Sequence, residues 1–141
     1  LEGRNQRSAL FKTMFLAFRA ACAKDWRSHL AIALDHSGAQ HRLQFHHIFP
    51  KAVLKTSFTA READDIANLA FIGGKTNRAI SDKAPAVYLP PLVDRLGEPA
   101  FAAQCIPVEA SLLEVESYKD FLLERRKRIA TALNTFVGPA D

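Results

Sequence analysis

Apolar residues recur at spacings of three and four positions near the N-terminus of the chain. This spacing places them on one face of an amphipathic helix that runs from about Asn5 to Ala23. We interpret the face as core, because apolar stripes of this width face the interior in globular proteins. A second helical patch is expected over Asp25 to Ala33, ended by His36-Ser37-Gly38. The first stripe consists of Leu10, Phe11, Met14, Phe15, Phe18 and Cys22.

A second long stripe of the same kind lies near the C-terminus. The segment Ser111 to Glu114 before it has the spacing of a capping box, which predicts the start of a long helix packed on the first one. The charged run from Glu124 to Arg128 falls between its apolar positions, and we interpret this run as a solvated face. The stripe consists of Tyr118, Phe121, Leu122, Ile129, Leu133 and Phe136.

Between the two stripes the pattern changes to short alternating runs and breakers. His41 to Ile48 alternates loosely and predicts a strand that Pro50 closes. Pro50 suits the first position of a short helix through Lys55, and the capping box from Thr59 to Glu62 predicts another helical turn.

A second strand is expected at Ile66 to Ile72, and Gly73-Gly74 breaks it. The polar segment Lys75 to Lys83 then predicts a helix. The order in this region is therefore strand, long loop, strand and helix. Loops and short turns are expected beyond it, because proline is unfavourable inside regular elements. The prolines in question are Pro85, Pro90, Pro91, Pro99 and Pro107.

Length and composition limit the architecture. A chain of 141 residues with 48% hydrophobic and 24% charged residues fits a single domain over residues 1–141. The elements predict a mostly helical α+β fold. Because the chain begins with Leu1, we expect it to be the C-terminal fragment of a longer protein, whose N-terminal domains would be its partners.

Charge and cysteine content narrow the environment. The balance of 19 basic against 15 acidic residues gives a net charge of +4 and a pI near 9.3, which favours polyanionic partners. Cys22 and Cys105 are far apart, which argues against a structural zinc site and a disulfide scaffold. Lys12 and Arg19 interrupt the most apolar stretch, so no membrane span is expected. These features favour a soluble, cytoplasmic protein.

The chemistry of the chain centres on two adjacent histidines and two asparagines. His46 and His47 end the first predicted strand, Asn68 lies in the second, and Asn77 lies in the following helix. A one-metal phosphodiesterase needs a metal site and a base that is neutral near pH 7, and imidazole and carboxamide groups supply both. Adjacent strand residues point in opposite directions, so the two histidines should have different roles.

These residues resemble the HNH, or ββα-metal, endonuclease motif in its His-Asn-Asn form. The matching segments are Phe45 to Pro50, Ile66 to Ile72 and Lys75 to Lys83, and the motif covers residues 42–85. A wider similarity, over most of Leu43 to Phe136, is to the C-terminal nuclease domain of GmrSD-type modification-dependent restriction proteins. Its further segments are Tyr88-Leu89, Ile106-Pro107 and Tyr118 to Arg126.

The resemblance implies a two-stranded antiparallel hairpin followed by a helix, packed with the N- and C-terminal helices. It also implies that His47 is the general base, that His46 and Asn77 bind the metal, and that Asn68 gives structural support. Many HNH enzymes have Asp at the position of His46 or His at the position of Asn77, so the ligand set here lacks a carboxylate. Mg²⁺ fits this set best, Mn²⁺ next and Zn²⁺ least.

Basic residues around the motif are candidates for contacting phosphates. They are Lys51, Lys75, Arg78 and Lys83. His29, His36 and His41 have no partner motif and are interpreted as surface residues.

Three functions remain open from the sequence. The first is a metal-dependent DNA endonuclease that belongs, by resemblance, to a restriction or phage-defence protein. The second is a nucleic-acid-binding or regulatory module with a degenerate nuclease site, which the missing carboxylate keeps open. The third is a helical interaction domain that forms a homodimer through its two long amphipathic helices.

Overall fold

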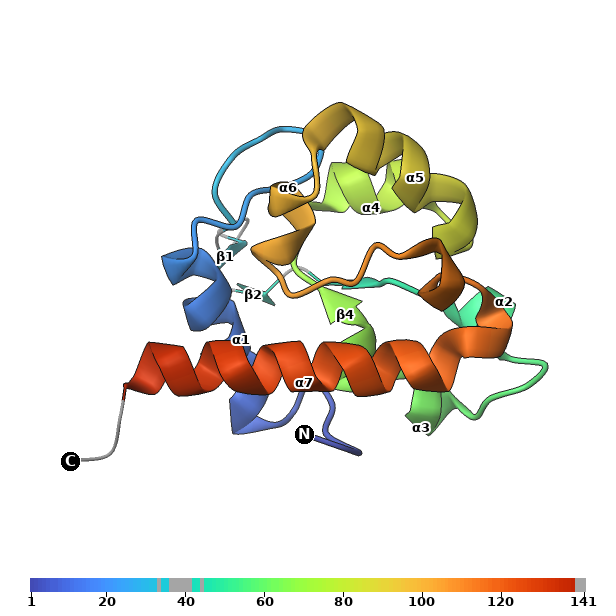
Figure 1. Ribbon diagram of the computed structural model, residues 1–141, viewed down its shortest axis with the longest axis horizontal. Helices are drawn as coiled ribbons and strands as arrows, with labels where there is room; N and C mark the ends of the chain where they lie inside the picture. Colours follow the sequence, from blue (N-terminus) through green and yellow to red (C-terminus); the bar gives the residue numbers. More distant parts are fainter. Residues whose placement is uncertain (33, 36–41, 44, 139–141) are drawn as a thin grey trace.

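The computed structural model describes residues 1–32, 34–35, 42–43 and 45–138 (Figure 1). It is mostly helical with small antiparallel sheets, which confirms the expected α+β class. The predicted helix end at His36-Ser37-Gly38 and the surface positions predicted for His36 and His41 lie outside these residues. No helix in the described ranges is both long and apolar enough to cross a bilayer.

The helical elements are seven α-helices and three 3-10 turns in the described ranges. The helices are α1 (Ala9–Ala20), α2 (Lys51–Leu54), α3 (Ala60–Ala63), α4 (Gly74–Ile80), α5 (Pro85–Leu96), α6 (Pro99–Ala102) and α7 (Tyr118–Val137). The 3-10 turns are η1 (Ile66–Asn68), η2 (Ala110–Leu112) and η3 (Val115–Ser117).

The strands are shorter than the sequence predicts. Strand β3 (His46–His47) pairs antiparallel with β4 (Leu69–Ala70), and β1 (Leu34–Asp35) pairs antiparallel with β2 (Arg42–Leu43). The predicted strand 41–48 is therefore divided between two sheets. The predicted strand 66–72 is shortened at its start by η1, because the side chain of Asp65 accepts a hydrogen bond from the backbone N–H of Ala67 and caps this turn.

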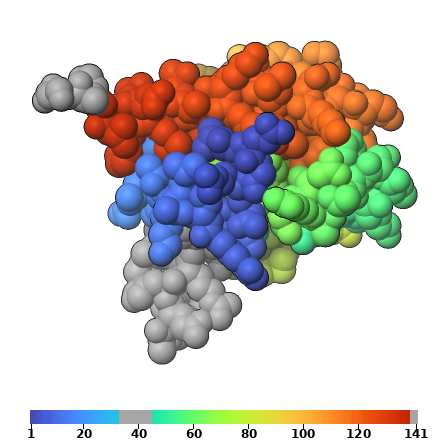
Figure 2. Space-filling view, turned by 90° about the horizontal axis from the view of Figure 1, so that it is seen from below, coloured from blue at the N-terminus to red at the C-terminus, as the bar shows by residue number. Residues whose placement is uncertain are grey.

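The two long helices pack on one another as predicted. Helix α7 runs along one side of the molecule, and the N-terminal segment lies against it (Figures 1 and 2). Helix α1 begins after Ser8, whose Oγ accepts a hydrogen bond from Leu10 N at 3.2 Å, and it ends at Ala20. Cys22 therefore lies beyond the helix, exposed and with a positive φ, and not on the core face.

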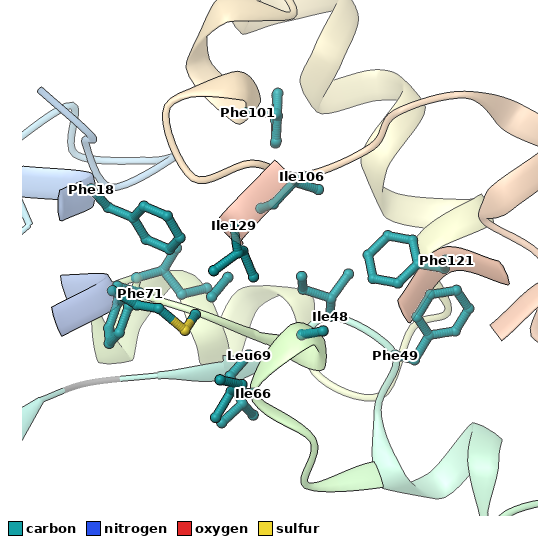
Figure 3. Close-up of a cluster of buried hydrophobic side chains, with 14 of the residues drawn as sticks. Phe18, Ile48, Phe49, Ile66, Leu69, Phe71, Phe101, Ile106, Phe121 and Ile129 are labelled. Atoms are coloured by element: carbon teal, nitrogen blue, oxygen red, sulfur yellow. The ribbon is translucent and has the colours of Figure 1, made fainter. Parts of the chain in front are cut away.

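The hydrophobic core fills the space between α1, α7 and the β3–β4 hairpin. Phe18 of α1 and Ile129 of α7 point into it together with Phe71, which follows β4 (Figure 3). Burial of one such side chain contributes roughly 1.5–3 kcal/mol. Most of the apolar stripes of α1 and α7 are thus buried within one chain.

Residues 25–32 form a tight turn instead of the predicted helix. The carboxylate of Asp25 accepts hydrogen bonds from the backbone N–H groups of Arg27 and Ser28, which competes with helical bonding. His29 has a φ of 61°, a value that a helix excludes. The chain then turns back so that Lys24 and Ala31 form an antiparallel bridge.

The proline-rich region contains helices where loops were predicted. Pro85 and Pro99 lie at the start of α5 and α6, where the missing N–H needs no partner. Pro90 and Pro91 lie inside α5, and the helix continues through them with Tyr88 and Leu89 buried. The prediction treated the prolines beyond Lys83 as breakers and missed the first-turn positions of Pro85 and Pro99.

The C-terminal helix also departs from prediction at two places. The expected capping box at Ser111 to Glu114 does not form; η2 and η3 occupy this region, and α7 begins only at Tyr118. The run from Glu124 to Arg128 is not a uniformly solvated face, because Arg125 is fully buried. Its guanidinium donates hydrogen bonds to the carbonyl oxygens of Leu69 at 2.6 Å and Ala67 at 2.9 Å, and so holds β4.

Candidate active site

The β3–β4 hairpin separates the two histidines as strand geometry requires. His46 faces Ala70 and His47 faces Leu69 in the antiparallel register. The side chain of His46 points into the molecule and is 3% exposed, whereas that of His47 is 22% exposed. The two imidazoles therefore have different environments although they are neighbours in sequence.

His46 lies between side chains from two helices. Its Nδ1 is 2.6 Å from Oδ1 of Asn77 on α4, and its Nε2 is 3.2 Å from the hydroxyl of Tyr88 on α5. The Tyr88 hydroxyl donates its proton to the carbonyl oxygen of Ile48 at 2.7 Å. Burial lowers the pKa of His46 to about 4, so the ring is neutral near pH 7.

The two contacts of the His46 ring compete for one hydrogen. The Tyr88 hydroxyl donates to the carbonyl oxygen of Ile48, so toward His46 it can only accept from Nε2–H, whereas Oδ1 of Asn77 can only accept from Nδ1–H. A neutral ring carries one hydrogen and satisfies one of these contacts. Both are satisfied with the hydrogen on Nε2 if the Asn77 amide turns its NH₂ group toward Nδ1, or if a cation binds Nδ1 and Oδ1.

The pair fits part of a divalent cation site. Ligands of Mg²⁺ lie about 2.1 Å from the ion, which places adjacent octahedral ligands about 3 Å apart. Nδ1 of His46 and Oδ1 of Asn77, at 2.6 Å, need to separate by only a few tenths of an ångström. In the described ranges, no group of three or more His, Cys, Asp or Glu side chains could hold a metal, so the chain would supply a ring nitrogen and an amide oxygen.

His47 contacts an acidic residue that the sequence analysis did not select. Its Nε2 is 2.8 Å from Oδ1 of Asp64, which also accepts from Nζ of Lys51 at 3.1 Å. Burial tends to raise the pKa of the Asp64 carboxyl, but hydrogen bonds from His47 and Lys51 outweigh it and lower the pKa below its ordinary value. Lys51, predicted to bind phosphate, is thus engaged with Asp64 and still half exposed.

Asn68 connects the long loop to the hairpin. Its Oδ1 accepts from Phe49 N at 2.8 Å, and its Nδ2 donates to the carbonyl oxygens of Phe49 at 3.0 Å and Ala63 at 2.9 Å. The side chain is fully buried. Because Phe49 follows β3 and Ala63 ends α3, this amide fixes both ends of the segment between the histidines and Asp64.

Helix α4 is held in position by Asp25. Its carboxylate accepts from Gly73 N and from the Thr76 hydroxyl, both at 2.7 Å, at the N-terminus of the helix that carries Asn77. Burial would raise the pKa of Asp25, but these bonds and those from its own turn lower it. The turn that replaces the predicted helix thus positions the predicted metal ligand.

Three basic side chains gather beside α4. Arg27 of the Asp25 turn joins Lys75 and Arg78 around a shallow surface hollow, and none of its described lining residues is acidic. All three are exposed, as is Lys83 beyond the helix. Lys75 and Arg78 were predicted to contact phosphates, whereas Arg27 was not.

The residues that sequence reasoning missed share one property. Asp64, Tyr88 and Asp25 act through contacts made by the tertiary fold, at sequence separations of 17, 42 and 51 from His47, His46 and Thr76 respectively. No local spacing links them to the motif. Only the adjacency of Asp64 to the capped turn Thr59 to Glu62 could have hinted at an ordered position.

Comparisons of the chain with models of known protein families, with curated proteins and with solved structures gave no match.

Proposed function

We propose that the chain is a metal-dependent DNA endonuclease domain of the HNH type that hydrolyses phosphodiester bonds. The observation that carries the proposal is the meeting of His46 and Asn77 at 2.6 Å, with the adjacent His47 partly exposed on the other face of the strand. The order β3, β4, α4 supports it, because a hairpin followed by a helix is the arrangement of the ββα-metal core. A role in restriction or phage defence follows from the resemblance alone.

The donor set supports a hard cation. His46 and Asn77 would hold the ion, with phosphate and water oxygens completing its coordination. Mg²⁺ ranks before Mn²⁺ and Zn²⁺ because the described residues offer neither a thiolate nor a second imidazole there. When bound, the cation would neutralise the charge that develops on the phosphate oxygens.

The chain's own residues supply the proton transfer and the positioning. His47 takes a proton from a water molecule, whose oxygen forms a bond to phosphorus while the bond to the leaving oxygen breaks. The leaving oxygen departs with the electron pair and receives a proton from solvent. Asn68 fixes the hairpin end that carries His47, and the exposed cations Lys75 and Arg78 bind neighbouring phosphates.

A cleavage assay tests the proposal. Supercoiled plasmid is incubated with the wild-type chain in Mg²⁺, in Mn²⁺ and in a chelator, and with His47→Ala. His29→Asn is the matched control, because it removes an imidazole from an exposed turn where Asn tolerates the positive φ. We expect metal-dependent nicking by the wild type and the control, and a loss of about 100-fold or more in His47→Ala with DNA affinity unchanged.

A second candidate function is a nucleic-acid-binding module without catalysis. Among the described residues no carboxylate joins His46 and Asn77, which favours this alternative because such a site holds a divalent ion less tightly. DNA binding by the wild type without metal-stimulated nicking would support this alternative and contradict the endonuclease. If His47→Ala cleaves DNA at the wild-type rate, His47 is not the general base.

A further inference from the structure

Asp64 is the partner of the candidate base. Its Oδ1 lies 2.8 Å from Nε2 of His47, although the two residues are 17 positions apart and Asp64 belongs to none of the segments that carry the resemblance. An ionised carboxylate only accepts hydrogen bonds. The contact therefore requires a proton on Nε2 of His47.

The position of that proton decides what His47 can do. A neutral imidazole has one N–H, and the other nitrogen carries the lone pair that can remove a proton from water. With Nε2 protonated, the free lone pair is on Nδ1. In the described part of the chain, no hydrogen bond to Nδ1 of His47 is formed.

We propose that Asp64 is a positioning residue that holds the His47 ring in its Nε2–H tautomer and fixes its orientation, so that Nδ1 receives the proton of the attacking water. This inference rests on the proposed endonuclease function. The carboxylate also stabilises the imidazolium that forms when Nδ1 is protonated, because its negative charge lies 2.8 Å from the ring.

Lys51 keeps the carboxylate in the form that this role needs. Its Nζ lies 3.1 Å from the same Oδ1, and the lowered pKa of Asp64 agrees with an ionised group facing two donors. The arrangement is therefore a chain of Lys51, Asp64 and His47. We infer that the main role of Lys51 is to keep the Asp64 carboxylate ionised.

Hydrogen bonds fix the backbone around Asp64. Asp64 follows α3, and its backbone N–H donates to the carbonyl oxygen of Ala60, the first residue of this helix, whose N-terminus the Thr59–Glu62 capping box holds. The preceding carbonyl, that of Ala63, accepts from the buried amide of Asn68. The same amide holds Phe49 after β3, so one side chain fixes the backbone on both sides of the His47–Asp64 pair.

Kinetics of Asp64 variants test the positioning role. In the metal-dependent cleavage assay we expect Asp64→Ala to lower kcat about 10- to 100-fold with KM changed less than twofold, the usual size for a group that orients a reacting side chain. Asp64→Asn should lose less, because its amide oxygen still accepts from Nε2 without the charge. Asp120→Asn, the same change at an exposed carboxylate of α7, should match the wild type.

Two kinetic outcomes would overturn the inference. If kcat of both Asp64→Ala and Asp64→Asn stays within twofold of the wild type, the carboxylate does not position His47. A loss that added Mg²⁺ restores would assign Asp64 to the cation instead. Circular dichroism checks that the variants fold, and Asp64→Asn preserves the side-chain shape if Asp64→Ala is unstable.

The tautomer of His47 can be measured without any cleavage. Long-range proton–nitrogen correlation spectra of the histidine-labelled chain at about pH 8, above the ordinary imidazole pKa of roughly 6.5, distinguish the two N–H forms. We expect Nε2–H for the resonance missing from His47→Ala, and a shift toward a mixture in Asp64→Ala. A ring in the Nδ1–H form overturns the inference whether or not the wild type cuts DNA. Absence of cutting together with an Nε2–H ring overturns only the endonuclease.

Discussion

The imidazole of His46 and the carboxamide of Asn77 lie 2.6 Å apart although 31 positions separate them in the chain. His46 lies on strand β3 and is held by Tyr88. Asn77 lies on helix α4, which Asp25 holds through Thr76. Both supporting residues lie outside the motif. Nδ1 of His46 faces Oδ1 of Asn77. This meeting point is where we expect the divalent cation.

Replacing Asn77 with Asp should strengthen cation binding. The change keeps the shape of the side chain and adds the carboxylate that the donor set lacks. We expect the half-saturating Mg²⁺ concentration to fall about tenfold, which corresponds to ~1.4 kcal/mol. Isothermal titration measures it, with Asn134→Asp on the exposed side of α7 as control. Equal Mg²⁺ affinity in Asn77→Asp and the wild type would argue against Asn77 as a ligand.

Removing the hydroxyl of Tyr88 should weaken the same site. Tyr88→Phe leaves Nε2 of His46 without its acceptor, so the ring loses its orientation, and metal affinity should drop about 10- to 100-fold. Tyr118→Phe is a matched control, because it also removes a hydroxyl that donates to a backbone carbonyl, that of Glu62 at 2.7 Å. If both variants weaken metal binding equally, the effect is one of general stability and not of His46.

Asn68→Ala should destabilise the fold around the site. The variant leaves the N–H of Phe49 and the carbonyl oxygens of Phe49 and Ala63 buried without these partners. We expect the free energy of unfolding to fall by about 3 kcal/mol, measured by denaturant titration. Asn134→Ala on the exposed face of α7 should change it by less than about 0.5 kcal/mol. If the free energy of unfolding changes little in both variants, the Asn68 side chain does not stabilise the loop against the hairpin.

The basic hollow beside α4 should contribute to DNA binding through phosphates. Lys75→Ala and Arg78→Ala should each weaken binding to any DNA sequence and reduce the slope of log affinity against log salt by about 0.9. Fluorescence anisotropy over a salt series measures this slope. Lys127→Ala, at an exposed position of α7, should leave it unchanged. An unchanged slope in the α4 variants would place the DNA elsewhere.

The sequence predicted the parts of the fold that periodicity governs. The stripes of α1 and α7 repeat over several turns, and the two helices pack on each other as expected. The capping box predicted from Thr59 to Glu62 forms with both of its hydrogen bonds, whereas the one predicted from Ser111 to Glu114 does not. His46 and Asn77 were selected as a pair from the motif, and the fold brings them into contact.

The failures have physical causes that act over long distance. Arg125 lies in a charged run that predicts a surface position, yet it is buried, and backbone carbonyls of β4 and η1 accept hydrogen bonds from its guanidinium. Asp25 reads as the start of a helix, but its carboxylate caps its own turn and α4 together. The capped turn before Asp64 indicates an ordered position, but no sequence spacing indicates that Asp64 contacts His47, which is 17 positions away.

The central claim is tested most directly by diffraction from crystals soaked in Mn²⁺, whose anomalous signal locates the ion. The account predicts a peak within bonding distance of both Nδ1 of His46 and Oδ1 of Asn77, about 2.0–2.2 Å from each. A peak at other side chains, or none at His46 under conditions in which Mn²⁺ stimulates cleavage, would contradict it.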